Sequence, residues 1–314
     1  MPSAMWSLIR GAAALVIVML AAVLSVTPAL VAQDPPRRPL ETRIAHTDPA
    51  KYRVQKAVHA GPGQLQYMGL FDHTSLDTNL IFLHRGVIAP KSGIGAHFHN
   101  QCEEMFVIFS GEAQFTIDGR TSVLKAPAGA PVRMGHSHAI YNHTDQPVEW
   151  MNINVSSLKA VYDAFNLRDP RVGAPLDEIP AFMTMRLDKA LLQPVDAMLG
   201  GKGAVQYRRA LNPSVFLGPW AYVDHIVLPP GASLGPNADP DFGGFYYVID
   251  GAGRVTLDTE SAPIKTGDAI PLQLNSRKTF ENTGTAPLEF LVVGVGRDAQ
   301  KKNDLLPRRQ LPKG

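Results

Sequence analysis

Residues 103–118 have the sequence EEMFVIFSGEAQFTID, and residues 243–258 have the sequence GGFYYVIDGAGRVTLD. The two stretches align without gaps at an offset of 140 residues. The same offset places PVRMGHSHAIYNHTDQPVEWMNINV (131–155) over PLQLNSRKTFENTGTAPLEFLVVGV (271–295). Because a single offset serves both pairs, we infer that the chain contains two copies of one domain.

Both copies have the pattern of β-strands. Short runs rich in Val, Ile, Phe and Tyr are separated by Gly, Pro, Asn and Asp, as in NLIFLHRGVI (79–88) and GFYYVIDGAG (244–253). Regularly spaced short strands are typical of an all-β sandwich or barrel. The pattern changes around residues 157–200, where LKAVYDAF (158–165) and DKALLQPVDAML (188–199) have a helical pattern. We therefore expect two β-domains joined by a partly helical linker.

The composition is that of a globular protein. The 314 residues are 45% hydrophobic and 18% charged, which excludes collagen, coiled coil and wholesale disorder. The net charge of +2 argues against a dedicated nucleic-acid binder, so we expect no nucleic-acid partner. Cys102 is the one cysteine, which excludes an intramolecular disulfide and predicts a buried free thiol.

The first 32 residues are predicted to be a signal peptide. Arg10 is the only charged residue before position 34, and the apolar run GAAALVIVMLAAVLSV (11–26) follows it. Cleavage near Ala32 would give a secreted protein, periplasmic in a two-membrane bacterium, with no stable membrane insertion. The alternative is an uncleaved membrane anchor, because the apolar run approaches spanning length.

The first copy concentrates histidine. Five of the ten histidines lie within residues 97–143, at positions 97, 99, 136, 138 and 143. His97 and His99 are two residues apart, so on a strand they share a face, and Glu103 and Glu104 follow them. Imidazole and carboxylate together suit a divalent first-row metal. Histidines without a metal are the alternative, and His84 is a further candidate for the barrel interior.

At these residues the sequence resembles the cupin family, and the double copy resembles the bicupins. The first cupin motif, G(X)5HXH(X)3-4E(X)6G, is matched except at its first glycine, where Lys91 stands. The matching residues are His97, His99, Glu104 and Gly111. The second motif, G(X)5PXG(X)2H(X)3N, is matched in its last part by Gly135, His138 and Asn142. Pro127 and Arg133 occupy its first glycine and its proline.

The resemblance implies an all-β fold of two jelly-roll barrels and one divalent transition metal, which would be Fe, Mn, Ni, Cu or Zn. The implied metal ligands are His97, His99, Glu104 and His138. The six-residue gap to Gly111 selects Glu104 over Glu103, which we expect to point outward into solvent. His136 is the rival of His138 as ligand. It shares the same strand face, so we also consider it a candidate catalytic proton donor or acceptor.

The second copy lacks the ligand set. The residues at the four aligned positions are Asn237, Asp239, Gly244 and Lys278. We expect no metal there, with the Lys278 amine at the metal position and paired with Asp239, or with both solvated. This barrel would then support folding or a homodimer.

These predictions divide the chain into six parts. They are a signal peptide (1–32), an N-terminal arm (33–74), cupin domain 1 with the metal site (75–156), a partly helical linker (157–204), cupin domain 2 with the degenerate site (205–297) and a basic tail (298–314).

Two functions follow from the resemblance. The first is a metal-dependent enzyme of the dioxygenase, decarboxylase, isomerase or lyase type. Three imidazoles and one carboxylate leave part of the +2 charge uncompensated, which favours a small anionic substrate. The second is a non-catalytic cupin that binds a small molecule, a sugar or a metal.

Overall fold

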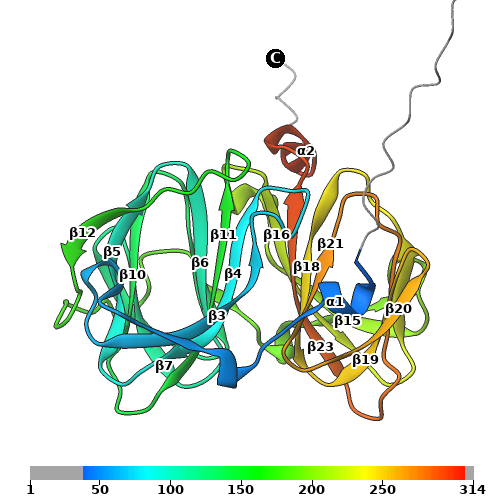
Figure 1. Ribbon diagram of the computed structural model, residues 1–314, viewed down its shortest axis with the longest axis horizontal. Coiled ribbons are helices and arrows are strands. Elements are labelled where there is room, and N and C mark those ends of the chain that lie inside the picture. The colour runs from blue at the N-terminus through cyan, green and yellow to red at the C-terminus, as the bar shows by residue number, and fades with distance from the viewer. Residues whose placement is uncertain (1–37, 308–314) are drawn as a thin grey trace, which may run out of the picture. The chain divides into compact units, whose positions relative to one another are not determined.

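Residues 38–307 are described by the computed structural model. The predicted signal peptide and residues 308–314 of the basic tail lie outside the described residues. No helix within 38–307 has the length and apolarity needed to cross a bilayer. The described part is almost entirely strand (Figure 1), as the sequence predicts.

Each repeat contributes ten strands to its barrel. In the first repeat these are β2 (Arg53–Lys56), β3 (Gln64–Asp72), β4 (Leu80–Ile88), β5 (Ser92–His99), β6 (Cys102–Ile108), β7 (Glu112–Ile117), β8 (Arg120–Lys125), β9 (Ala128–Val132), β10 (His136–Asn142) and β11 (Val148–Ser156). In the second they are β14 (Gln193–Asp196), β15 (Ala204–Leu211), β16 (Trp220–Leu228), β17 (Ser233–Asn237), β18 (Phe242–Asp250), β19 (Ala252–Leu257), β20 (Glu260–Lys265), β21 (Asp268–Leu272), β22 (Lys278–Glu281) and β23 (Leu288–Gly296).

Two sheets face each other in each barrel. The first barrel has the strand orders β13-β9-β6-β11-β4-β3-β2 and β12-β5-β10-β7-β8, and the second has β1-β21-β18-β23-β16-β15-β14 and β17-β22-β19-β20. The additional strands are β1 (Ala45–His46), β12 (Phe165–Asp169) and β13 (Met185–Arg186). Corresponding strands start 140 to 142 residues apart, from β1 and β13 to β11 and β23. The repeat therefore extends into the predicted arm, where β2 and β3 lie, and into the predicted linker.

The two barrels exchange a strand. β1 precedes the first barrel but pairs with β21 of the second, with Ala45 opposite Ala269. β13 precedes the second barrel but pairs with β9 of the first, with Met185 opposite Gly129. Each of these residues lies 140 positions from its counterpart, so the exchange obeys the symmetry of the repeat. The blue N-terminal segment in Figure 1 follows this path from the second barrel into the first.

The outer faces of the long sheets form a shared apolar core. On β6, Phe106 and Ile108 point into the first barrel, whereas Met105 and Val107 join a cluster that contains Phe245 of the second barrel. Successive side chains of a strand point to opposite faces, so a strand covered on both faces buries all its residues. All of β6 is buried in this way.

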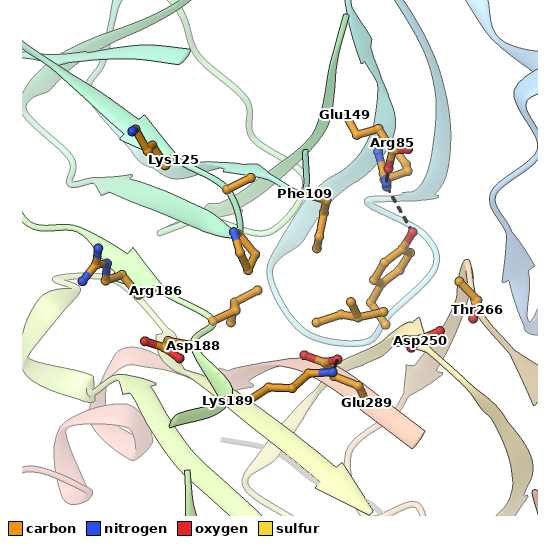
Figure 2. A pocket seen from close by; sticks show the side chains of 15 residues that line it. Arg85, Phe109, Lys125, Glu149, Arg186, Asp188, Lys189, Asp250, Thr266 and Glu289 are labelled. Carbon is orange, nitrogen blue, oxygen red and sulfur yellow. Dashed lines mark hydrogen bonds and ion pairs between the residues drawn. The ribbon is translucent and has the colours of Figure 1, made fainter. Parts of the chain in front are cut away.

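A buried arginine also links the barrels. Arg85 donates from Nε to the hydroxyl of Tyr247 at 3.1 Å, a contact marked in Figure 2. The same guanidinium donates to the carbonyl of Trp150 at 3.1 Å and lies 4.7 Å from the centre of the Phe109 ring. These groups line a cleft of about 720 Å³ to which both repeats contribute residues.

Glu103 points outward, but the prediction that it is solvated is wrong. The second barrel covers it, and the residue is 1% exposed. Its two carboxylate oxygens accept hydrogen bonds from the backbone N–H groups of Leu217 at 2.7 Å and Gly218 at 2.9 Å. Burial raises the pKa of Glu103 to about 7, although both N–H groups oppose the shift.

The α-helices expected over 158–165 and 188–199 do not form. The helical residues described between 157 and 204 are two 3-10 turns, η3 (Lys189–Leu191) and η4 (Met198–Gly200). They correspond to η1 (Pro49–Lys51) and η2 (Val58–Ala60) before the first barrel. Strand pairing with the barrels decides the conformation here, because local helix propensity is a weak preference that tertiary contacts override. The described α-helices are α1 (Leu40–Arg43) and α2 (Ala299–Asp304), and a further 3-10 turn is η5 (Pro213–Val215).

We predict that Glu103→Ala lowers the free energy of unfolding by about 2–4 kcal/mol. The substitution leaves two N–H groups unpaired at the barrel interface, and each buried donor without a partner costs about 1–3 kcal/mol. Urea unfolding followed by circular dichroism measures the change. Glu112→Ala is the control, because that carboxylate is about one-third exposed, and a loss there equal to that of Glu103→Ala contradicts the prediction.

Candidate metal centre

Four side chains converge between the two sheets of the first barrel. His97 and His99 lie on β5 and His138 on the adjacent strand β10, where it is paired with His97. Glu104 comes from β6 in the facing sheet. All four are buried, and their donor atoms lie within 4.8 Å of one another. The structure therefore brings together the four residues that the sequence selected.

The distances within this cluster fit one cation. His138 Nε2 lies 3.0 Å from His97 Nε2 and 3.2 Å from His99 Nε2. Glu104 is within 3.4 Å of His99 Nε2 and 3.7 Å of His138 Nε2. Two nitrogens bound at 2.0–2.1 Å and at right angles to one metal would be about 3.0 Å apart. The set would fill part of an octahedron and leave positions open for a ligand.

Backbone carbonyls fix the orientation of two imidazoles. His97 Nδ1 is 2.9 Å from the carbonyl oxygen of Gly95, and His99 Nδ1 is 2.6 Å from that of Asp163. A carbonyl only accepts, so each Nδ1 carries the proton and each Nε2 presents a lone pair to the centre of the cluster. Hydrogen bonds of this kind orient metal-binding histidines in proteins.

Two asparagines hold the carboxylate. Asn152 donates from Nδ2 to Glu104 Oε1 at 2.8 Å, and Asn154 donates to Oε2 at 2.7 Å. Both lie on β11, where Asn154 is directly opposite Glu104. The sequence analysis missed them, although the polar positions in WMNINV (150–155) alternate with apolar ones and thus mark one strand face.

Burial keeps the imidazoles neutral. It lowers the pKa of His97 to about 2 and the pKa of His138 well below its usual value. The ring of Phe106 stacks on His138 with centroids 4.4 Å apart, and this apolar wall adds to the desolvation. Neutral imidazoles are the form that binds metals. One carboxylate with three neutral rings would leave a divalent cation with a net charge of about +1.

A cavity of about 420 Å³ reaches the cluster at His97 and Glu104. Its walls are largely aromatic and include Tyr67, Phe82 and Trp150. No lysine or arginine is present among its described lining residues. Any attraction for an anion would therefore depend on a metal held by the cluster.

His84 lines this cavity, as expected for the barrel interior, and burial lowers its pKa to about 4. His59 stacks on His97 with centroids 3.9 Å apart, and Tyr162 also lines the cavity. The sequence analysis missed His59 and Tyr162 because they lie in the predicted arm and linker, outside the repeat stretches then aligned.

His136 does not join the cluster. It is the first residue of β10, its ring is 45% exposed, and Nδ1 lies 2.5 Å from Asp118 Oδ2. It is absent from the described lining of the cavity. A catalytic role for His136 stays a prediction that this position does not favour.

The fourfold set has no equivalent in the second barrel. Both groups of potential metal ligands found within residues 38–307 lie in or beside the first barrel. The second of these consists of His99, Cys102 and Asp163, but burial raises the pKa of the Cys102 thiol to about 12. A protonated thiol is a poor metal ligand.

Comparison with known proteins places the chain in a family. Residues 84–154 and 224–294 each match the model of the cupin domain. An oxalate-binding protein of Thermotoga maritima is 30% identical over 111 residues, which are 35% of this chain and 92% of that protein. The chain belongs to the cupin family. Since it contains two such domains, it is a bicupin.

Solved bicupin structures share the fold. An oxalate decarboxylase of Lactobacillus farciminis in complex with formate covers 80% of this chain and 86% of its own, with 14% identity and a TM-score of 0.57. Oxalate decarboxylase of Bacillus subtilis at pH 4.6 covers 79% of this chain and 75% of its own, with 16% identity and a TM-score of 0.55. Another structure of the B. subtilis enzyme, described for its Mn(II) centres, has 16% identity and a TM-score of 0.53, and covers 79% and 76%. The predicted fold of two jelly-roll barrels is confirmed.

We predict that His138→Ala loses most of the bound metal, whereas Lys278→Ala at the equivalent position of the second barrel does not. His138 is the central member of the cluster, and Lys278 lies in the barrel without such a set. Elemental analysis of the purified variants by mass spectrometry measures the metal content. Equal losses in the two variants contradict an asymmetric bicupin.

We also predict that Asn154→Ala weakens metal binding about 10- to 100-fold, as loss of a group that orients a ligand does elsewhere. Competition with a chelator measures the affinity. Asn303→Ala removes an exposed asparagine on α2 and is the control. An unchanged affinity in Asn154→Ala contradicts a role in holding Glu104.

Proposed function

We propose that the chain is an exported metalloenzyme of the oxidoreductase or lyase class. Its substrate would be a small dicarboxylate, with oxalate as the first candidate, bound at the cluster of the first barrel. One observation carries this proposal: three imidazole nitrogens meet at 3.0–3.2 Å around His138.

Without a cation this arrangement is unfavourable. The Nδ1 protons of His97 and His99 are committed to the carbonyls of Gly95 and Asp163, so their Nε2 lone pairs and the Glu104 carboxylate converge. Water does not offset the repulsion, because all four side chains are buried. A divalent cation would convert the repulsion into coordination, which supports metal binding as the purpose of the site.

The identity of the metal is inferred from relatives. The donor set accepts Fe, Mn, Ni, Cu or Zn. Mn is the first candidate, because the B. subtilis oxalate decarboxylase with the same fold is described for its Mn(II) centres. The residues that would hold the metal are His97, His99, Glu104 and His138.

An anionic substrate is supported by the cavity. Its described lining lacks lysine and arginine, so the metal would provide the positive charge. Oxalate is the first candidate, because the T. maritima relative is named an oxalate-binding protein. The aromatic walls would exclude water and strengthen the attraction between metal and carboxylate.

When bound, the metal would act as a Lewis acid, and Mn or Fe would also supply redox chemistry. The side chains in the cavity would handle protons. Burial lowers the pKa of His59, which stacks on His97, so at neutral pH its imidazole would accept a proton. Burial raises the pKa of Tyr162, which keeps its hydroxyl protonated as a hydrogen-bond donor to the substrate.

A non-catalytic role is the second candidate. The T. maritima relative is named for binding and not for turnover. In this alternative the same metal would retain a dicarboxylate without converting it. The leader at residues 1–32 supports export in either case, with the periplasm as the location in a two-membrane bacterium and a membrane anchor if cleavage fails.

We predict that protein loaded with Mn(II) binds oxalate and converts it, and that the metal-free protein does neither. Formate and carbon dioxide in equal amounts would identify a decarboxylase, whereas oxygen uptake with hydrogen peroxide would identify an oxidase. Calorimetry measures binding, and mass spectrometry with an oxygen electrode measures turnover. His138→Ala is the inactive control.

Binding without products would favour the non-catalytic role. Binding of oxalate that survives removal of the metal would contradict the site, since no other cation lines the cavity among the described residues.

A further inference from the structure

The second barrel retains a cavity of about 220 Å³ at the place equivalent to the metal cavity. Its lining residues lie 140 positions after those of the first cavity. Tyr207 corresponds to Tyr67, Asp224 to His84, Asn237 to His97 and Leu199 to His59. The cavity is therefore the counterpart of the first one, with different side chains on the same scaffold.

Part of the new lining neutralises itself. Arg209 stands where the first repeat has Gly69, and its guanidinium donates to both carboxylate oxygens of Asp224 at 2.9 and 3.3 Å. The same guanidinium lies 4.2 Å from the centre of the Tyr222 ring. A bidentate pair of this kind fixes both side chains and cancels their charges. It forms a polar wall without a free charge.

Two other polar groups have no partner. The Lys278 ammonium makes no hydrogen bond or ion pair with any residue in the described part of the chain, although the side chain is largely buried. Asn237 Oδ1 is buried and lacks a donor. Asp239 lies nearby, but its Oδ1 accepts the N–H groups of Asp241 at 2.9 Å and Phe242 at 3.2 Å. The cavity thus presents one unpaired cation and one unpaired acceptor.

We propose that this second cavity binds a small hydroxycarboxylate without a metal. The carboxylate would pair with the Lys278 ammonium, and the hydroxyl would donate to Asn237 Oδ1. The Tyr222 and Tyr246 rings line the same space and would pack against the carbon chain. The proposal is independent of the chemistry proposed for the first barrel.

The lining excludes the ligand of the first cavity. Lys278 occupies the position of His138, and its positive charge would repel a metal ion. Gly244 replaces Glu104 and has no donor atom. Its φ is +134°, and a Cβ at this position would lie 2.0 Å from the Val293 carbonyl oxygen, so there is no room for a side chain. A carboxylate is the ligand that an unpaired buried ammonium favours.

The size restricts the ligand further. A space of 220 Å³ equals the volume of about seven water molecules in the liquid. This is below the usual range of pockets for larger ligands, about 300–1,000 Å³. The cavity reaches the surface beside Leu199 and Leu305, each about two-fifths exposed, so a small acid has access.

A matched series of two-carbon compounds tests the proposal. Calorimetry on the full chain with a chelator present measures the binding of glycolate, acetate, ethylene glycol and glycine. We expect glycolate to bind more tightly than acetate, which lacks the hydroxyl, and ethylene glycol to show no binding because it lacks the carboxylate. Tighter binding of glycine or of ethylene glycol than of glycolate would overturn the proposal.

Variants locate the site. Lys278→Met should weaken glycolate binding at least about tenfold, the effect of losing one charge-assisted hydrogen bond. Lys265→Met removes an exposed lysine of the same barrel and should leave the affinity unchanged. Lys278→Arg preserves the charge and should retain measurable binding, which separates loss of the ligand contact from misfolding. Circular dichroism confirms that each variant is folded.

His138→Ala separates the two barrels. Glycolate binding should persist in this variant and in the presence of chelator. Equal affinities of wild type and Lys278→Met, absence of glycolate binding to the wild type, or loss of binding with the chelator would each overturn the proposal. None of these results depends on whether the first barrel converts oxalate.

Discussion

The crowding of lone pairs around His138 is the constraint on which the rest of the site depends. Backbone carbonyls commit the outer nitrogens of His97 and His99, and two asparagines commit the oxygens of Glu104. The inner atoms then have no protein partner that would relieve their repulsion. A barrel that is stable with such an arrangement must be rigid, and the strands β5, β6, β10 and β11 provide that rigidity from two facing sheets.

The two barrels show how one scaffold supports two kinds of site. In the first, neutral imidazoles and a carboxylate surround a space suited to a cation. In the second, the same positions carry Asn237, Asp239, Gly244 and Lys278, and an Arg209–Asp224 pair fills the place of small or neutral residues. The backbone is repeated at a nearly constant offset, so the difference lies in side chains alone. Loss of the metal ligands did not remove the cavity.

The sequence predicted the repeat, the fold class and the four converging side chains, because each depends on local spacing. His97 and His99 share a strand face, and the interval to Gly111 selects Glu104. It did not predict the cover over Glu103, since that depends on packing between barrels that are far apart in sequence. His59 and Tyr162 were missed for the same reason. The helices expected in the linker failed because strand pairing outweighed local propensity.

The exchange of β1 and β13 has a consequence for how the molecule unfolds. Each barrel holds a strand that belongs to the other repeat, and the two share an apolar core that includes Met105 and Phe245. Melting of either barrel would strip an edge from its neighbour, so cooperativity extends across both halves. Mutations that erode the chemistry of one half are tolerated under this arrangement, whereas deletion of that half is not.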